Sequence, residues 1–583
     1  MVRIFSIILL LVTLANAEVR TLWQTLHDYN TIVEPVHDGR QDTHKVNPFL
    51  SYTNIGTDFG FLGPAENQLG WQPGQIGATL GDGPFEWAGI WHSLSRLARM
   101  KESTLNFSAC YPAQIAPAFQ PKVSAIRLVI RGKGRVKIDL VDEKNNLLWS
   151  EVREIDHQEF SHEVYALKTE TLLSVKMLEW IVEPGSDLDI DRVDFSIQTP
   201  DVTFDRWVFL VSYAKALTCW SPATGLVRDR AHIDDGSFDS ISATGLFCLA
   251  TAAAASENIV TKDFAKQVMH SAYRAATPLR GPYQLLPHFA KKSDDGKIAI
   301  HEGTEYSTID TALFYIGLIL SAQICDDQEM LTQLINDVKK IQLAPLITPD
   351  GYVSHGVMAD GKTIIPYQWK DWGGETALVI ILQHLAEPSL KAAMSKDGVP
   401  HQGTGFIAEI QSLLLPDFDS EAIDAISLVN WKLVRTSLLT EQKSYLSNNF
   451  PENSFAKQGF YGLSAGEQKH GMGYFVGGSA LTNQLLLHPH YVLMSAAIDA
   501  NPTSVIDLLQ KMERNNIFTP WGMVENVSIT TGETLPMIGS LNACFEALGA
   551  YHLHKKISGG TNAIYDASRE ITEMRSALKI FYP

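Results

Sequence analysis

The sequence predicts a mainly α-helical fold, a toroid of paired outer and inner helices preceded by a β-sandwich-like accessory domain. The first observation is a change of hydrophobic period at Pro200, from the alternation typical of strands to the three-and-four spacing of amphipathic helices. The second is that about eleven helical patterns then follow one another, joined by loops rich in Gly, Pro and aromatic residues. No fixed repeat length is present, which disfavours a solenoid. We therefore expect three segments, residues 1–17, 18–200 and 201–583.

Residues 1–17 have the pattern of a cleavable signal peptide. Arg3 provides a short basic start, an apolar run covers residues 4–14, and Ala15 and Ala17 are small residues just before the expected cleavage point. The apolar run is well short of the ~20 residues that a helix needs to cross a bilayer. The sequence therefore predicts a secreted or periplasmic protein with no membrane insertion.

Residues 18–200 have the short alternating stretches of a β-rich domain. Apolar and polar residues alternate over 126–130 and 136–140, and Gly132-Lys133-Gly134 between them has the composition of a hairpin turn. Further strand-like stretches lie at 147–152, 163–166, 172–182 and 192–197. Short strands at this spacing predict an antiparallel sandwich.

Residues 201–583 carry the helical patterns, and loops rather than strands separate them. About 380 residues of this pattern fit a barrel of outer and inner helices better than a simple bundle. The helices are expected at residues 204–218, 241–256, 262–275, 308–323, 328–341, 375–385, 422–439, 490–497, 504–514, 540–554 and 563–579.

Composition and charge exclude several classes of partner. Hydrophobic residues make up 45% of the chain, which is enough for a large core. The net charge of −18, without any run of Lys or Arg, argues against nucleic acid and anionic membrane surfaces and suits a neutral ligand. The cysteines are scattered and show no CxxC spacing, so we expect no cysteine metal site and at most one or two disulfides. They are Cys110, Cys219, Cys248, Cys325 and Cys544. We also expect no cofactor.

The stretch HEGTEYSTIDTALFYIGLIL at residues 301–320 combines a carboxylate with a well-marked helix start. Ser307 is a good N-cap, and Asp310 three positions later completes an S-x-x-D capping pattern, which explains that aspartate. Glu305 then lies just outside the helix, on the loop side. A loop carboxylate held by a rigid helix is a common way to present a general acid, whereas an ordinary exposed Glu near a helix end is the simpler interpretation.

Four loops between the predicted helices share carboxylates, aromatic residues and glycines. They cover residues 224–239, 302–306, 352–375 and 459–478. This mixture suits sugars, because aromatic faces stack on pyranose rings and two carboxylates can act as acid and base. Trp369, Trp372 and Trp521 are candidate stacking platforms, although core packing is the commoner use of a single tryptophan.

Six blocks in the helical part resemble, in the same order, the glucoamylase-like family of (α/α)6 barrels, which includes bacterial endo-β-1,2-glucanases. The resemblance covers about residues 203–556, and residues before Pro200 lie outside it. The blocks are TGLVRDR (224–230), SISATGL (240–246), EYSTIDTAL (305–313), YQWKDWGGE (367–375), FYGLSAGEQKHGMGY (460–474) and TPWGMVENV (519–527).

The resemblance implies an inverting glycosidase, in which acid and base stand roughly 6.5–9.5 Å apart on opposite sides of the scissile bond. Glu305 matches the glutamate of the family's E-x-S-x-I-D pattern and is our candidate acid. Glu467 stands where the family pattern often has Asp, so its side chain is one methylene longer. Rival candidates for the base or for substrate contacts are Asp229, Asp234, Asp235 and Asp239. Further candidate substrate contacts are Arg230, Tyr306, Trp369, Trp372, Glu375, Tyr474 and Trp521.

Three hypotheses from different classes follow. The leading one is a glycoside hydrolase that cleaves a β-glucan, possibly β-1,2-linked. The second is a glycan-binding protein on the same fold that has lost one catalytic carboxylate, for which the change at Glu467 is the reason. The third is a polysaccharide lyase, which ranks last because a lyase needs cations to neutralise a uronate and these loops hold more carboxylates than basic residues.

Overall fold

The structure is a computed structural model. It describes residues 106–168, 172–182, 186–230, 238–293, 296–468, 474–481, 485–497, 501–515, 517–532, 534–535 and 538–583, and the backbone of five short strands before residue 94. The expected signal peptide lies outside the described residues, as do Asp234 and Asp235. The chain forms two compact units, of which the first comprises residues 1–203, 232–235 and 519–521, and the second the remainder.

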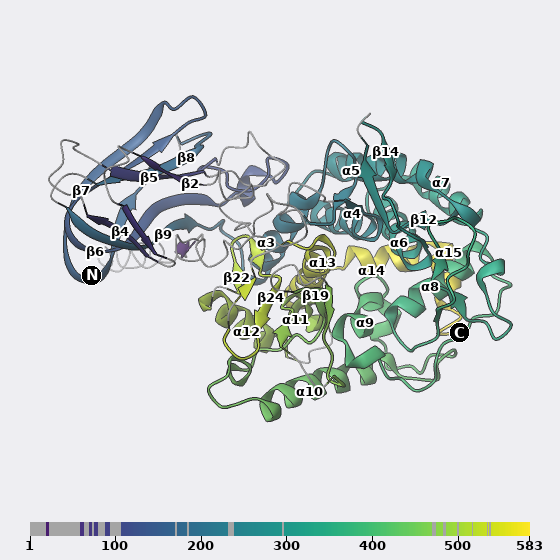
Figure 1. The fold of residues 1–583 in the computed structure, drawn as a ribbon. Helices are drawn as coiled ribbons and strands as arrows, with labels where there is room; N and C mark the ends of the chain where they lie inside the picture. Colours follow the sequence, from purple (N-terminus) through teal and green to yellow (C-terminus); the bar gives the residue numbers. More distant parts are fainter. Residues whose placement is uncertain are drawn as a thin grey trace, which may run out of the picture. The chain divides into compact units, whose positions relative to one another are not determined.

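The first unit is built on one antiparallel sheet of nine strands, with the order β2-β5-β8-β6-β9-β4-β3, β1 beside β9 and β7 beside β6 (Figure 1). Its longest strands are β6 and β7, each of 20 residues. The strands are β1 (Val19–Thr21), β2 (Phe59–Leu62), β3 (Leu69–Gln72), β4 (Gln75–Thr79), β5 (Ala88–Ser93), β6 (Lys122–Val141), β7 (Leu147–Ala166), β8 (Met177–Val182) and β9 (Asp187–Gln198). Hydrogen bonds thus join all nine strands in a single sheet, where the sequence predicts the two sheets of a sandwich.

The predicted hairpin at Gly132-Lys133-Gly134 is wrong, because β6 continues through it. Along one edge, β6 pairs with β9 up to Lys133 and then with β8 from Val136. A Cβ at Gly132, where φ is 108°, would lie 2.0 Å from the carbonyl oxygen of Asp187. The glycines therefore permit close backbone contact within a strand rather than a reversal. The reversal comes at Asp142, whose Oδ1 accepts hydrogen bonds from the amides of Lys144 and Asn146.

The second unit is mainly α-helical, and its helices fall into two kinds (Figure 1). One kind is buried nearly all round, and the other buries a single face. The first kind comprises α3 (Phe204–Cys219), α4 (Ile241–Ser256), α6 (Thr308–Ile324), α8 (Gly374–Ala386), α9 (Gly405–Glu409), α11 (His490–Met494) and α13 (Ser540–Ser558). The second comprises α5 (Lys262–Ala276), α7 (Gln328–Val338), α10 (Trp431–Asn449), α12 (Pro502–Arg514), α14 (Ala563–Glu570) and α15 (Thr572–Leu578).

Most predicted helices are present, and two need correction. The helix expected at 422–439 begins only at Trp431, because the Asp424 carboxylate accepts the amides of Ile426 and Ser427 and the Trp431 indole N–H, which keeps this segment in a loop. The helix expected at 563–579 is divided into α14 and α15 at Ile571, whose ψ of 120° is extended. The short buried helix α9 is not predicted.

Buried helices α4 and α6 touch backbone to backbone. A Cβ on Gly245 would lie 2.4 Å from the Cα of Phe314, and one on Gly317 would lie 2.2 Å from the carbonyl oxygen of Gly245. Both helices begin at a serine N-cap, Ser240 for α4 and Ser307 for α6. The close approach therefore brings two helix starts, and the residues around them, to the same end of the unit.

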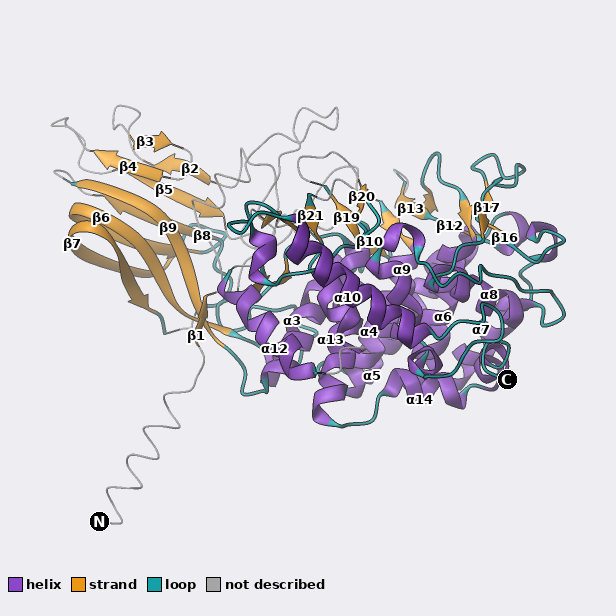
Figure 2. Ribbon diagram, turned by 90° about the horizontal axis from the view of Figure 1, so that it is seen from below, coloured by secondary structure: helices purple, strands orange, loops and turns teal. Residues whose placement is uncertain are grey.

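Short strands cover that end, and Figure 2 shows them gathered along one side of the helices. They are β10 (Val227–Arg228), β11 (Asp239–Ser240), β12 (Leu286–Pro287), β13 (Phe289–Lys292), β14 (Ile298–Ile300), β15 (Tyr306–Ser307), β16 (Val353–Ser354), β17 (Gly356–Val357), β18 (Gln368–Trp369), β19 (Ala465–Glu467), β20 (Tyr474–Val476), β21 (Leu486–Leu487), β22 (Phe518–Thr519), β23 (Gly522–Met523), β24 (Asn526–Ser528) and β25 (Thr534–Leu535). Five predicted site residues lie in these strands, namely Asp239, Tyr306, Trp369, Glu467 and Tyr474, and Asp229 and Glu305 lie directly beside one.

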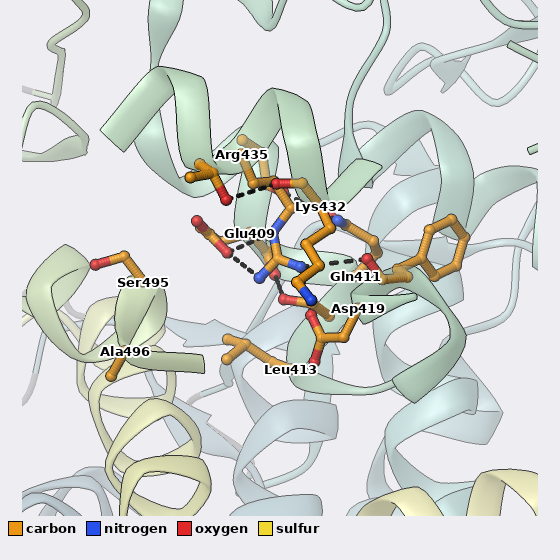
Figure 3. A network of polar contacts seen from close by, with 12 residues as sticks. Glu409, Gln411, Leu413, Asp419, Lys432, Arg435, Ser495 and Ala496 are labelled. Atoms are coloured by element: carbon orange, nitrogen blue, oxygen red, sulfur yellow. Dashed lines mark hydrogen bonds and ion pairs between the residues drawn. The ribbon is translucent and has the colours of Figure 1, made fainter. Parts of the chain in front are cut away.

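A buried ion-pair network fixes the short helix α9 (Figure 3). Arg435 of α10 is fully buried, and its guanidinium donates to the Glu409 carboxylate at the end of α9, with an Nε–Oε2 distance of 2.7 Å. It also pairs with Asp419, whose other oxygen accepts the hydroxyl of Tyr565 from α14. We call Arg435, Glu409 and Asp419 the Arg435 network.

No helix in the described part of the chain is long and apolar enough to cross a membrane. All five cysteines are buried, and all are free thiols.

Candidate active site

The candidate site lies where buried helices begin, and six carboxyl groups meet there. Asp229 follows β10, Glu305 precedes β15, Asp310 and Glu375 lie in the first turns of α6 and α8, and Glu467 ends β19 while Glu525 precedes β24. Their proximity shows in their mutual electrostatic influence and in their common neighbours His288, Arg230 and Tyr474. We call these six side chains the carboxylate cluster.

Glu305 lies outside helix α6, as predicted, since Thr308 is the first helical residue and the Ser307 hydroxyl caps it by accepting the amide of Asp310 at 3.2 Å. The strand pairing of β12 with β15 holds this segment, and the amide of His288 donates to the carbonyl of Glu305. The His288 ring is 3.0 Å from the Glu305 carboxylate through Nδ1. This hydrogen bond lowers the pKa of Glu305, so in this state Glu305 is a carboxylate rather than a proton donor.

Asp310 does more than the capping pattern predicts. The cap bond uses its amide, while its nearly fully buried carboxyl group lies 3.8 Å from Nε2 of His288. Burial lowers the pKa of His288, but Asp310, Glu305 and Asp229 outweigh burial and raise it to about 9. His288 is therefore an imidazolium at neutral pH, held between carboxylates. The sequence offers no separate signal for this role, because the S-x-x-D spacing already accounts for the aspartate.

Arg230 connects two of the predicted carboxylates. Its Nε and Nη2 lie 2.7 and 2.6 Å from Oε1 of Glu467, and its Nε lies 3.9 Å from Oδ2 of Asp229. Burial raises the pKa of Asp229 to about 6, with Glu467 and Asp310 adding to the rise and Arg230 opposing it. Glu467 thus has its own guanidinium partner, whereas Asp229 lies further from that charge.

Of the predicted carboxyl groups, Glu375 has the fewest cations or hydrogen-bond donors to stabilise its negative charge. It is partly exposed, and within the described residues its carboxyl group forms no hydrogen bond or ion pair. Burial and the nearby Asp310 raise its pKa to about 7, although His288 opposes the rise. Tyr474 is 51% exposed, yet desolvation of its hydroxyl near Glu525, Glu375, Glu467 and Asp229 likewise raises the pKa of this tyrosine.

Glu525, Asn526 and Asn542 were not among the predicted site residues, yet they hold the backbone of Glu467. Oε1 of Glu525 accepts the amide of Glu467 at 3.0 Å and Nδ2 of Asn542 at 2.7 Å. Nδ2 of Asn526 donates to the Glu467 carbonyl at 2.6 Å. Burial raises the pKa of Glu525 to about 7, with Lys215 opposing the rise. Glu525 and Asn526 fall within the block at 519–527 that carries part of the family resemblance, and this was the one sequence signal that could have indicated them.

The predicted stacking platforms separate into one accessible and two buried rings. Trp369 is partly exposed, stacks on His355 at 4.0 Å between ring centroids, and donates its indole N–H to Thr308. Trp372 is 0% exposed and packs against Trp431, so its assignment as a platform is wrong.

Trp521 is also buried, and it packs edge to face against Tyr111 within the first unit, so this assignment is wrong as well. For both rings, core packing explains the tryptophan. Tyr306 is partly exposed and its ring lies against Gly281, where a Cβ would clash with it. Asp239 is nearly buried in β11.

No set of three or more His, Cys, Asp or Glu side chains within the described ranges is arranged to hold a metal ion. The cluster also differs from a metal site in its bonding, since the best placed oxygens of Glu305 and Glu467 already accept hydrogen bonds from His288 and Arg230.

Solved structures with this fold are glucanases and glucoamylase-like proteins. The β-1,2-glucanase of Parabacteroides distasonis superposes with a TM-score of 0.54 at 11% identity, over 92% of this chain and 98% of its own. Two proteins proposed to be glucoamylases, from Bacteroides uniformis and Bacteroides fragilis, superpose with TM-scores of 0.51 at 12% and 14% identity, over 65% of this chain and 97% of theirs. No protein-family model matches the chain, and no curated protein matches it by sequence. The chain therefore has the glucoamylase-like fold that the six sequence blocks predict.

Proposed function

We propose that this protein is a glycoside hydrolase that cleaves a β-glucan, with β-1,2-linked glucan as the first substrate to test. One observation carries the proposal. At one end of the helical unit, a carboxylate that is bonded to a cation lies near a carboxyl group that has no such partner. Glu467 is bonded to Arg230, whereas the pKa of Glu375 is raised to about 7. Carboxyl groups whose environments differ in this way can divide the roles of base and acid. The fold shared with the Parabacteroides distasonis β-1,2-glucanase suggests the linkage.

The proposed enzyme inverts the anomeric centre. Glu467 serves as base with its charge stabilised by Arg230, and Asp229 is the alternative base. The acid is Glu305 by resemblance or Glu375 by electrostatics, and the hydrogen bond from His288 to Glu305 favours Glu375. We further propose that the helices close into an (α/α)6 toroid, and that residues 1–17 direct the protein to the periplasm or outside the cell.

A panel of glycans tests the substrate class. The protein should release reducing sugar from linear β-1,2-glucan, and less from β-1,3-, β-1,4- and α-1,4-linked glucans, and NMR of the first product should show the α-anomer that inversion requires. A protein that binds β-1,2-glucan without turnover would instead be the glycan-binding alternative. Unsaturated products from a uronate polymer would indicate a lyase. The cluster disfavours a lyase, because its carboxylates repel uronates and because the raised pKa of Tyr474 keeps this hydroxyl protonated, so that it cannot accept a proton as a base.

Matched variants distinguish the two candidate acids. Glu305→Gln and Glu375→Gln each keep the shape of the side chain and remove its acidity. The variant of the true acid should lose about 10²–10⁴ in rate on the natural glucan, yet retain most of its activity on a glycosyl fluoride, whose leaving group needs no proton. A variant that fails equally on both substrates has lost binding or positioning instead. If neither variant is selectively impaired on the glucan, the two-carboxylate mechanism is wrong for these residues.

A further inference from the structure

The segment from Gly522 to Asn526 holds the backbone of Glu467 from two sides. Glu525 accepts the Glu467 amide and Asn526 donates to the Glu467 carbonyl, while Asn542 of α13 donates both to Glu525 and, at 3.2 Å, to the carbonyl of Ala465. All three side chains are at least 96% buried. We call Glu525, Asn526 and Asn542 the cradle.

The cradle fits closely around β19. A Cβ on Gly466 would lie 2.6 Å from Oε1 of Glu525 and 2.8 Å from Nδ2 of Asn542. Real side chains do not approach that closely, so only glycine allows the strand to lie this deep against the cradle. The glycine before Glu467 therefore serves the contact with the cradle.

A buried ion pair lies behind the cradle. Lys215 of α3 and Glu546 of α13 are 2.7 Å apart, with side chains 2% and 0% exposed. Both also bond to the backbone of Met523, whose amide donates to Oε1 of Glu546 at 3.0 Å and whose carbonyl accepts Nζ of Lys215 at 2.6 Å. At Gly522, where φ is 102°, a Cβ would lie 2.4 Å from Cδ of Lys215.

Burying two charges costs several kcal/mol per ion before their attraction is counted, so this pair needs a reason beyond general stability. Its bonds to both polar groups of Met523 supply one, because they fix the backbone two residues before Glu525. The chain of contacts then runs from the Lys215–Glu546 pair through Met523 to the cradle and on to Glu467.

We propose that the cradle and the Lys215–Glu546 pair are positioning residues for Glu467. This inference rests on the proposed function, in which Glu467 is the base. Arg230 binds the carboxylate end of Glu467, and the cradle binds its backbone. The Glu467 side chain, although one methylene longer than that of Asp, is therefore held in one orientation. Oε1 of Glu525 accepts both of the hydrogen bonds that this residue makes in the cradle, so glutamine, which keeps that oxygen, can replace it.

The test compares Glu525→Gln, which keeps the acceptor, with Glu525→Leu, which removes it at similar size. Hydrogen exchange of the peptide that contains Glu467 should become about tenfold faster in Glu525→Leu, as expected for the loss of one buried hydrogen bond, and should be unchanged in Glu525→Gln. On linear β-1,2-glucan, kcat of Glu525→Leu should fall about 10²-fold with little change in KM, since misplacement by about 1 Å has that effect. Asn526→Ala removes only the carbonyl contact and serves as a milder variant if Glu525→Leu does not fold.

The paired change Lys215→Met/Glu546→Leu should accelerate exchange at Met523 and at Glu467 together. Glu257→Gln is the matched control. It alters a largely buried carboxylate at the ends of α4 and α13 that lie away from the candidate site, so it should leave exchange at Glu467 unchanged. Unchanged exchange at Glu467 in Glu525→Leu would overturn the proposal, as would faster exchange with unimpaired turnover. Exchange requires no substrate, so a parent protein that cleaves no β-glucan would refute the proposed function while exchange still decides whether the cradle holds Glu467.

Discussion

The Arg435 network and the carboxylate cluster use the same residue types within one helical unit, yet they differ in how directly their carboxyl groups are bonded to cations. In the network, Glu409 and Asp419 share one fully buried guanidinium. In the cluster, six carboxyl groups have Arg230 and His288 as their close cations, with Lys215 behind Glu525. The network joins helices α9 and α10, and the side chains of Arg435 and Glu409 are closed to solvent, whereas Glu305 of the cluster is more than one third exposed.

The comparison teaches that direct bonding to a cation separates a structural group of carboxylates from a chemical one. Burial raises the pKa of Glu409 to about 7 although Arg435 opposes the rise, but this carboxyl group is bonded to a fully buried guanidinium and therefore holds its neighbours in place. A carboxyl group with too few cations has its pKa raised into the range where it can exchange a proton near neutral pH, as Glu375 and Asp229 show. Four predictions follow the same division, from the largest expected effect to the smallest.

The largest effect concerns the pH dependence of glucan cleavage. If neutral Glu375 donates the proton, kcat/KM should fall tenfold for each pH unit above about 7, because its raised pKa leaves the acid form dominant only below that value. Rates measured from pH 5 to 9 check this. On a glycosyl fluoride, the decrease in kcat/KM near pH 7 should disappear. A decrease that persists on the fluoride would arise from another group and would contradict the acid role of Glu375.

In the Arg435 network, the expected effect is on stability. Arg435→Met should lower the free energy of unfolding by about 3–5 kcal/mol, because it leaves the Glu409 carboxylate buried without its cation. Replacing both partners, as in Arg435→Met/Glu409→Leu, should recover most of this loss. Denaturant titration followed by circular dichroism measures both. Equal destabilisation by the single and the paired change would show that packing, rather than charge compensation, decides stability here.

A second compensated group predicts how stability varies with pH. Glu257 at the end of α4 bonds to His554 and Lys555 of α13, and the hydrogen bond from His554 contributes most to lowering the pKa of Glu257 to about 2. A lowered pKa stabilises the fold above the unfolded value of about 4.5, so on the order of 1–3 kcal/mol should be lost as pH falls from 4.5 to 2.

His554 acts at the other end of the pH range. Burial lowers its pKa, but hydrogen bonds to Asp205 and Glu257 outweigh burial and raise it. The stability that this adds is complete below about pH 6.5 and is lost as pH rises through the folded pKa. Melting temperatures of the parent and of Glu257→Gln should therefore converge at low pH, and parallel curves from pH 2 to 5 would contradict the assignment.

Local pattern predicted the helix starts well, because a cap depends on neighbours in sequence. Ser307 caps α6 and leaves Glu305 outside it, as the spacing indicates. The two glycines at 132 and 134 predicted a turn that is absent, because glycine serves both turns and close contacts, and only the distant Asp187 distinguishes the two uses. The assignment of Trp372 and Trp521 as stacking platforms was wrong for a similar reason, since the burial of a side chain depends on residues far away along the chain.

The site itself was predictable in its residue types and less so in its arrangement. The carboxylates Asp229, Glu305, Glu375 and Glu467 lie together as the loop composition suggests. Arg230 was among the predicted residues, but its bond to Glu467 was not predicted, and His288 was not among the predicted residues. His288 lies on the loop between β12 and β13, and its effect on Glu305 needs the pairing of β12 with β15.

The smallest effect separates the two roles that meet at the start of α6. Ser307→Ala removes the hydroxyl that accepts the Asp310 amide and should cost about 1 kcal/mol of stability, whereas Asp310→Asn keeps that amide and should leave the helix start intact. Asp310→Asn should instead lower the pKa of His288, because it removes the carboxylate that contributes most to raising it. Thermal melts measure the first effect, and NMR titration of the imidazole signals measures the second. If Asp310→Asn destabilises the protein as Ser307→Ala does and the His288 titration does not move, Asp310 belongs to the helix cap alone and the carboxylate cluster has one member fewer.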